Sequence, residues 1–223
     1  LIFTHAQAIA AIKVESIVNR PTNIPRGLVV IAPAKKYLMR ERLFSVLAEK
    51  LAFQGYIVVR FNWATDTLQT PKLELQKASR DIQNVILAMQ NSFGFNPNKT
   101  ILVSKSFSTK ALDASLGLAK THILLTPNCS NEESFQKTYW NVLNKADLSL
   151  RVFISTQDPF CSIDEIRRTL RFLSKLQLLR TTMYGDHNFV VTNASTKQPF
   201  FGYQDQVINS IVQQIELIGS QSQ

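Results

Sequence analysis

Short apolar runs alternate with amphipathic segments along most of this 223-residue chain. The clearest run, Gly-Leu-Val-Val-Ile-Ala-Pro at residues 27–33, is followed by apolar side chains at helical spacing between residues 43 and 52. Consecutive apolar residues indicate a strand that is buried on both faces, as in a parallel sheet. Parallel strands also need long crossover connections, which helices of this length supply. The pattern therefore predicts an α/β fold.

Further segments of both kinds extend this prediction over the whole chain. No linker rich in Gly, Pro or Ser divides the sequence, so residues 1–223 are expected to form a single domain. Residues 1–25 form an N-terminal edge segment, which adds an antiparallel strand through residues 12–17. The rest forms a mostly parallel central sheet of about six or seven strands with helices on both faces. Strands are expected at residues 27–33, 56–61, 99–103, 122–125, 151–155 and 180–184, and helical segments at residues 43–52, 73–89, 104–119, 163–176 and 206–218.

The composition excludes several other classes of protein. Apolar residues make up 45% of the chain and charged residues 18%, which excludes a disordered polypeptide. No uncharged apolar run approaches the roughly 18–20 residues that cross a bilayer, so no membrane partner is expected. The sequence therefore favours a cytoplasmic protein, although Leu1 is not an initiator Met, which leaves a removed targeting segment open.

Basic residues outnumber acidic ones, 25 to 16, which gives a formal net charge of +9. They are spread along the chain without RNP-type aromatic motifs, paired Cys/His fingers or basic-zipper heptads, so no nucleic-acid partner is expected. Cys129 and Cys161 match no zinc spacing, and two buried or reduced thiols are expected instead of a metal site. No Gly-rich phosphate cradle or nicotinamide fingerprint appears, so no cofactor is predicted.

A serine stands where the third predicted strand ends. The sequence Val-Ser-Lys-Ser-Phe-Ser at residues 103–108 places Ser106 at the apex of a strand-to-helix turn. This is the position of a nucleophile elbow, usually written G-x-S-x-G, whose strained apex lifts the serine hydroxyl clear of the sheet. Ser104 and Ser108 stand where glycines are usual, and both are small. An ordinary turn or cap serine is the alternative.

Two more strand ends carry residues suited to catalysis. Asp158 follows the fifth strand, and His187 lies in the Gly-Asp-His-Asn-Phe loop after the sixth. The carboxyl ends of parallel strands meet at one edge of a sheet, so Ser106, Asp158 and His187 are expected to gather there. His122 opens its strand at the opposite edge, and His5 lies in the N-terminal segment. Taken alone, Asp158 also fits a simple turn former.

Together these features resemble the α/β-hydrolase superfamily, in which the triad residues follow the chain order Ser, Asp, His. The likeness covers roughly residues 26–218 and is closest to small, nearly lidless members: dienelactone-hydrolase-like proteins and the testis-expressed-protein-like group with a K-S-type elbow. It is carried by the strand at residues 27–33, Arg-Phe-Asn at residues 60–62, the Ser106 elbow, Gln-Asp-Pro-Phe at residues 157–160 and the His187 loop. It implies an α/β-hydrolase fold with a minimal lid.

The resemblance also implies a serine hydrolase that acts on small esters, thioesters or amides. Ser106 would attack the carbonyl carbon, and His187 would accept the serine proton and return it to the leaving group. Asp158 would fix the imidazole tautomer and stabilise its charged form. Residues 128–147 stand where the superfamily inserts lids, and about twenty residues are too few for a large cap. The site is therefore expected to be open and suited to short acyl groups.

The oxyanion of such a reaction would be held by backbone N–H groups. The resemblance assigns this role to Phe107 and to Ala34 or Lys35, in the loop after the first buried strand. Many members of the superfamily have His-Gly there, whereas this chain has Pro33-Ala34. This departure, together with the serines in the elbow, keeps a second hypothesis open: a catalytically weakened or inactive hydrolase-fold protein that binds or interacts.

Four basic residues fall at or just beyond predicted strand ends: Lys35, Lys36, Arg60 and Lys105. If they ring the mouth of the site, they attract a small-molecule substrate that carries a carboxylate or phosphate. The alternative is that these side chains extend into water and do not contact the substrate. For the assembly we expect a monomer or a homodimer.

Overall fold

One sheet forms the centre of the computed structural model, which describes residues 4–5, 14–35, 38–64, 71–129, 148–170 and 177–221. Its eight described strands are β1 (Thr4–His5), β2 (Ser16–Asn19), β3 (Gly27–Ala32), β4 (Tyr56–Phe61), β5 (Thr100–Lys105), β6 (Thr121–Leu125), β7 (Ser149–Ser155) and β8 (Gln177–Met183). They lie in the order β1-β2-β4-β3-β5-β6-β7-β8. The strands from β4 to β8 are parallel, whereas β2 pairs antiparallel with β4 and β1 with β2. The predicted α/β class is confirmed.

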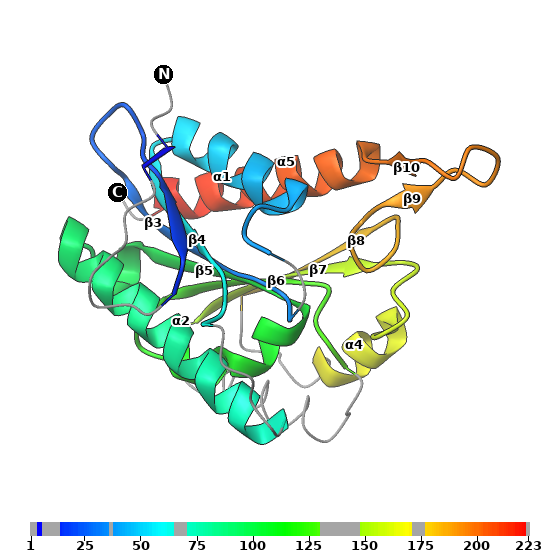
Figure 1. Ribbon diagram of the computed structural model, residues 1–223, viewed down its shortest axis with the longest axis horizontal. Helices are drawn as coiled ribbons and strands as arrows, with labels where there is room; N and C mark the ends of the chain where they lie inside the picture. Colours follow the sequence, from blue (N-terminus) through cyan, green and yellow to red (C-terminus); the bar gives the residue numbers. More distant parts are fainter. Residues whose placement is uncertain are drawn as a thin grey trace.

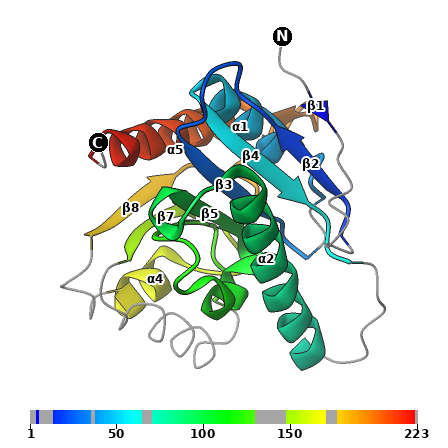
Figure 2. The same cartoon turned by 90° about the vertical axis from the view of Figure 1, so that its left-hand side faces the viewer.

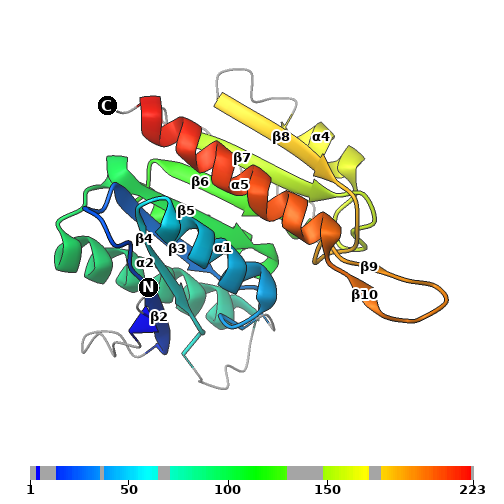
Figure 3. The same cartoon turned by 90° about the horizontal axis from the view of Figure 1, so that it is seen from above.

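Helices cover both faces of this sheet. On one face lie α1 (Arg42–Phe53) and α5 (Gly202–Gln221), side by side (Figures 1 and 3). On the other lie α2 (Pro71–Phe93), the 3₁₀ segment η2 (Ser106–Ser115) and α4 (Ile163–Leu170), while the short η1 (Pro97–Lys99) precedes β5. The hairpin of β9 (Val191–Thr192) and β10 (Pro199–Phe200) projects from the body before α5 (Figure 3). Within the described ranges, no helix is both long and apolar enough to cross a membrane.

The alternation of side chains along β3 divides the core into two layers. Val29 and Ile31 pack with the helices α1 and α5, whereas Leu28, Val30 and Ala32 pack with α2 and η2. Figure 2 shows the sheet between these two sets of helices. Because both faces of β3 are covered, every position along the strand is buried. This burial explains the consecutive apolar residues from which the parallel sheet was predicted.

The segment after the elbow differs from the helix expected over residues 104–119. It forms the 3₁₀ segment η2, and Ala111 inside it has a non-helical backbone (φ −98°, ψ 18°). The hydroxyls of Thr109 and Ser115 donate to the carbonyl oxygens of Ser106 and Leu112, three residues earlier in each case. Such local side-chain bonds compete with the α-helical pattern. The hydroxyl-rich sequence therefore favours a tighter, interrupted helical segment.

Other boundaries shift by a few residues or lie outside the described ranges. The N-terminal edge strand pairs over Ser16–Asn19 instead of residues 12–17, because this is the stretch in register with Val58–Phe61 of β4. Lys36, residues 130–147 of the expected lid and residues 171–176 of the expected fourth helix lie outside the described residues.

Cys129 and Cys161 are buried, but they form a disulfide, so the expectation of free thiols is wrong. Their Cα atoms lie 4.8 Å apart, although the residues are 32 positions apart in the sequence. They meet because β6 and β7 are neighbours in the sheet and each cysteine lies in the loop after one of these strands. The bond ties the loop after β6 to the loop that carries Asp158.

His122 lies near the amino end of β6, and its imidazole is fully buried. Burial lowers the pKa of His122 from 6.5 to about 4, although its bond with the Ala119 carbonyl oxygen partly opposes this shift. The unfolded chain therefore takes up a proton near pH 6.5 that the folded chain accepts only near pH 4. The free energy of unfolding should thus decrease as the pH falls through this range, by roughly 2 kcal/mol between pH 6.5 and pH 5.

Urea unfolding at pH 7 and pH 5 measures this effect. His122→Leu removes the titrating group, so the variant should lose less stability on acidification than the wild type. Other acidic groups add the same background to both proteins. An identical pH dependence in the two proteins would contradict the assignment to His122.

Candidate active site

Ser106 follows the last residue of β5 and has a φ of 51°. This is the left-handed region of backbone conformation, which costs free energy for any residue other than glycine. β5 lies between β3 and β6 near the middle of the sheet, so Ser106 stands at a central position on its carboxyl edge. Its side chain is nearly buried, at 8% exposure. A strained serine between a central strand and a helical segment is the backbone geometry that a nucleophile elbow requires.

Ser108 is buried in the elbow at a position where glycine is usual. Its Oγ accepts a hydrogen bond from the Lys105 N–H at 2.7 Å and lies 3.0 Å from the carbonyl oxygens of Ala32 and Lys105, to which it donates. Ala32 ends the neighbouring strand β3. The hydroxyl of Ser108 therefore links the elbow to the adjacent strand instead of separating the two.

Ser108→Ala is expected to lower the free energy of unfolding by about 1–3 kcal/mol, because it leaves a buried N–H and a buried carbonyl without this partner. Ser115→Ala is a matched control, since Ser115 is also buried in η2 but its hydroxyl bonds only to the Leu112 carbonyl oxygen. Urea unfolding of both variants gives the comparison. Equal losses in the two variants would contradict a special role for Ser108.

Asp158 and His187 lie in direct contact. The imidazole Nδ1 is 2.8 and 2.9 Å from the two carboxylate oxygens of Asp158, and the Asp158 side chain is 1% exposed. The backbone N–H of Phe160 also donates to this carboxylate at 2.8 Å, and the Phe160 ring packs edge-on against the imidazole, with 4.8 Å between ring centroids. A carboxylate in this position favours the tautomer with the proton on Nδ1 and leaves Nε2 as the acceptor.

The loop that carries His187 is docked onto the end of β7. The carbonyl oxygen of Gly185 accepts hydrogen bonds from the Gln157 N–H, at 3.0 Å, and from the Ser155 hydroxyl. Gly185 has a φ of +126°, and a Cβ there would lie 2.8 Å from the carbonyl carbon of Phe189. Only glycine fits this turn. The turn places His187 beside Asp158.

Lys105 does not ring the mouth of a site, contrary to the sequence-based expectation. Its side chain is fully buried, and Nζ donates to the His187 carbonyl oxygen at 2.6 Å and to Thr126 Oγ1 at 2.8 Å. Thr126 Oγ1 in turn donates to the same carbonyl at 3.0 Å. Lys105 was predicted to be exposed because it stands at the end of a strand. This position does not predict that the loop after β8 covers the Lys105 side chain.

Two other predicted cations are also engaged in the structure. Arg60 is buried, and its guanidinium donates to the Met39 carbonyl oxygen and to Ser45 Oγ, at 2.8 and 2.7 Å, so it supports the N-terminal side of the sheet instead of a substrate. Lys35 is exposed, and its ammonium is paired with Glu74 at 2.5 Å. The expected ring of free cations is therefore not formed by Arg60, Lys105 and Lys35.

Trp63 connects two of the residues predicted to hold an oxyanion. Its indole N–H donates to the Ala34 carbonyl oxygen at 3.2 Å, and its ring lies edge-on to Phe107, with 5.9 Å between centroids. Ala34 is not among the described non-glycine residues with a positive φ, so the alanine fits without left-handed strain. Trp63 is not among the residues predicted from the sequence, although it directly follows the Arg-Phe-Asn stretch at the end of β4.

A cleft of about 170 Å³ opens beside Phe107. It contains two ion pairs, Lys35 with Glu74 and Lys77 with Asp81, so the charges that line it balance. The cleft is lined by Lys35, Trp63, Ala64, Glu74, Lys77, Ala78, Asp81 and Phe107. It adjoins the predicted oxyanion residues and is the hollow best placed to receive part of a substrate.

The structure thus joins Asp158, His187 and the strand that precedes Ser106, with one contact of the predicted triad absent. Asp158 contacts His187, and Lys105, which directly precedes Ser106, contacts the His187 backbone. In the described part of the chain, no direct hydrogen bond joins the Ser106 hydroxyl to the imidazole of His187. Such bonds are often long in proteins without substrate and tighten in the complex. Within the same ranges, no cluster of three or more His, Cys, Asp or Glu side chains is arranged to hold a metal ion.

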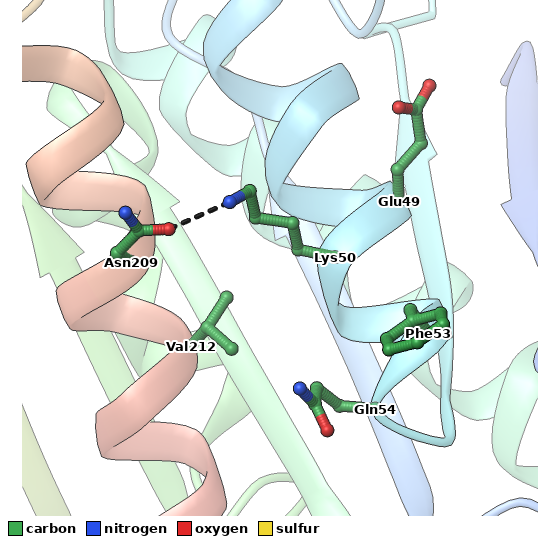
Figure 4. Close-up of a pocket in the computed structure, with 6 residues that line it drawn as sticks. All are labelled: Glu49, Lys50, Phe53, Gln54, Asn209 and Val212. Atoms are coloured by element: carbon green, nitrogen blue, oxygen red, sulfur yellow. Dashed lines mark hydrogen bonds between the residues drawn. The ribbon is translucent and has the colours of Figure 1, made fainter. Parts of the chain in front are cut away.

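A larger groove, of about 410 Å³, lies away from this region between α1 and α5 (Figure 4). Lys50 and Asn209 are hydrogen-bonded across it at 2.8 Å, and it is also lined by Glu49, Phe53, Gln54 and Val212. None of these is a predicted site residue, and none is a nucleophile or a histidine. The chemistry therefore points to the cleft beside Phe107 and not to this groove.

Neither a protein-family model nor a curated protein matches the chain. Solved structures do match it. An alpha-beta serine hydrolase homologue from Coxiella burnetii has a TM-score of 0.68 at 16% identity, and 96% of each chain is covered. A serine hydrolase without lid from Xanthomonas campestris has a TM-score of 0.61 at 15% identity, over 84% of this chain and 85% of that one.

A dienelactone-hydrolase-like promiscuous phosphotriesterase from metagenomic libraries has a TM-score of 0.69 at 11% identity, with 98% of each chain covered. At these identities the likeness concerns the fold. The chain has the α/β-hydrolase fold, as its resemblance to that superfamily implied.

Proposed function

We propose that this protein is a serine hydrolase that acts on small ester substrates, with thioesters and amides as further candidates. The observation that carries the proposal is the strained backbone of Ser106. Lys105, the residue before it, donates a hydrogen bond to the backbone of His187. The imidazole of His187 is in turn bonded to Asp158. Strain of this kind persists only where the surrounding structure enforces it, and it is concentrated at functional sites.

In the proposed reaction, Ser106 Oγ attacks the carbonyl carbon of the substrate while His187 Nε2 takes the hydroxyl proton. Asp158 accepts the Nδ1–H and stabilises the imidazolium that forms. The N–H of Phe107 and that of Ala34 or Lys35 donate to the oxyanion. His187 then protonates the leaving group. A water molecule, deprotonated by the same imidazole, attacks the acyl carbon; the bond from this carbon to Ser106 Oγ breaks, and the imidazolium returns the proton to Oγ.

Labelling with a fluorophosphonate probe tests this proposal. The probe should modify the wild-type protein at Ser106, as mass spectrometry of the labelled peptide can show. A panel of short-chain p-nitrophenyl esters then gives the preferred acyl length. A well-folded protein that takes up no label would overturn the proposed activity.

The second candidate is a hydrolase-fold binding protein with weak or no catalysis. The lack of a direct hydrogen bond between Ser106 and His187 in the described part of the chain favours it over a fully active enzyme. The same labelling experiment separates the two, because a binding protein folds normally but reacts with the probe no faster than free serine does.

The balanced charges of the cleft beside Phe107 give a prediction about substrate charge. Lys35 and Lys77 are each paired with a carboxylate, so a carboxylated ester gains little from them. Neutral and carboxylated esters with the same leaving group should therefore have kcat/KM values within about fivefold, the ratio set by 1 kcal/mol. Steady-state kinetics measures this ratio. A much larger preference for the carboxylated ester would restore the hypothesis of an anionic substrate.

The assembly, the nucleic-acid partner and the location of the protein can each be tested. We propose a monomer or homodimer with no nucleic-acid partner, and analytical ultracentrifugation with and without duplex DNA tests both points. A cytoplasmic location is tested by fractionation, and the Cys129–Cys161 disulfide makes this experiment informative, because such bonds are rare in reducing compartments.

A further inference from the structure

Lys105 is an unusual residue to find beneath a nucleophile elbow. Its side chain has no exposed surface, yet it carries an ammonium group into the interior of the protein. Nζ donates to the carbonyl oxygen of His187 at 2.6 Å and to Thr126 Oγ1 at 2.8 Å, and Thr126 donates to the same carbonyl. One buried cation thus joins the strand of Ser106, the end of β6 and the loop of His187.

The surroundings of Lys105 are costly for a charged group. Burial lowers the pKa of Lys105 to about 7, and the nearby carboxylates of Asp158 and Asp186 only partly oppose this effect. The ring of Phe189 lies on another side, with 6.0 Å between Nζ and its centroid, and Asp186 and His187 are titratable groups on the same loop. A charge in such a position disfavours the folded state unless it is fully compensated.

Three carbonyl oxygens of the His187 loop accept hydrogen bonds from other parts of the fold. The carbonyl oxygen of Gly185 is held from the end of β7, and that of Asn188 by the side chain of Gln204 on α5. Of these three carbonyl oxygens, only that of His187 accepts a hydrogen bond from β5, whose last residue, Lys105, is the donor. This hydrogen bond joins the backbone of His187 directly to the residue that precedes Ser106.

We propose that Lys105 is a positioning residue that fixes the backbone of His187 relative to Ser106 and so keeps the imidazole within reach of the serine hydroxyl. This proposal rests on the proposed function for the role of His187, but the contact itself does not. Lys105 acts through His187 and touches no substrate.

Lys105→Met tests the proposal, because methionine has a similar length and volume and removes only the ammonium. Thr126 still donates to the His187 carbonyl oxygen, although its own Oγ1 loses the hydrogen bond from Lys105. The variant should be at least as stable as the wild type in urea at pH 7, because a buried charge has been removed. Its kcat for a short-chain ester should fall by roughly 10- to 100-fold with KM nearly unchanged, the effect expected of a displaced catalytic group.

The ring nitrogens of His187 give a readout that does not depend on activity. The chain has three histidines, so ¹⁵N spectra of the wild type and of histidine variants assign each signal. In the wild type, His187 should show a single tautomer with the proton on Nδ1. In Lys105→Met, its signals should broaden or shift toward a tautomer mixture, whereas Lys110→Met, a half-buried lysine in η2, should leave them unchanged.

The outcomes separate this proposal from the proposed function. Wild-type His187 signals in Lys105→Met would overturn the positioning role, whether or not the protein is labelled by fluorophosphonate. A parallel loss of stability and kcat would also overturn it and identify Lys105 as a structural support. Altered His187 signals in a protein that takes up no label would support the positioning role while contradicting hydrolase activity.

Discussion

Ser106→Ala is expected to abolish fluorophosphonate labelling and to lower kcat for short-chain esters by about 10⁴- to 10⁶-fold. The substitution removes the only atom proposed to form the acyl intermediate. The oxyanion donors and the cleft beside Phe107 remain, and they account for any residual rate above that in water. The measurement is single-turnover hydrolysis of a p-nitrophenyl ester with the variant in excess.

The fold should be unaffected by this change, because alanine retains the Cβ and the strained backbone at φ 51°. Urea unfolding should therefore give the same midpoint for both proteins. Ser195→Ala is a matched control, since Ser195 is an exposed serine in the β9–β10 hairpin. A Ser106→Ala protein that keeps its activity would show that another group attacks the substrate.

Asp158→Asn should lower kcat by about 10⁴-fold, with little change in KM. The carboxylate accepts the Nδ1–H of His187, and it stabilises the imidazolium when the serine proton is transferred. An amide of the same shape donates its N–H₂ to Nδ1, which moves the imidazole proton to Nε2. The nitrogen that faces the serine then has no lone pair to accept a proton, so the base is lost.

The stability of Asp158→Asn is expected to stay close to that of the wild type, because the amide oxygen still accepts from the Phe160 N–H. Asp164→Asn is the control, an exposed carboxylate a few residues further along the chain. Steady-state kinetics of the two variants provides the comparison. If Asp158→Asn retained more than a tenth of the wild-type kcat, Asp158 would have no place in the proposed mechanism.

The order of strands and helices could be predicted from the sequence because the spacing of apolar residues reflects which faces of each element are buried. β3 is apolar at successive positions because helices cover both of its faces, and α1 is apolar at helical spacing because one face packs on the sheet. β4 follows the same rule, since it is buried at every position. The placement of Asp158 and His187 at one sheet edge follows from parallel pairing alone.

The fate of the charged residues could not be predicted in this way. Lys105 and Arg60 both stand near strand ends, and a strand end does not reveal whether a loop covers it. Lys105 is buried because the His187 loop, far along the chain, folds over it. The contacts of Trp63 and the Cys129–Cys161 disulfide could not be predicted for the same reason, since each joins segments that are distant in the sequence.

The serine-lined elbow has a consequence for how such proteins are found. Ser108 fits at a position where glycine is usual because its hydroxyl is hydrogen-bonded to the Lys105 N–H and lies 3.0 Å from the carbonyl oxygens of Ala32 and Lys105. If Ser106 is the nucleophile, as proposed, a genome search that demands glycine on both sides of the nucleophile overlooks chains with a small hydroxyl side chain at these places. A search pattern that admits serine at these places, together with a later Asp and His at strand ends, would recover them.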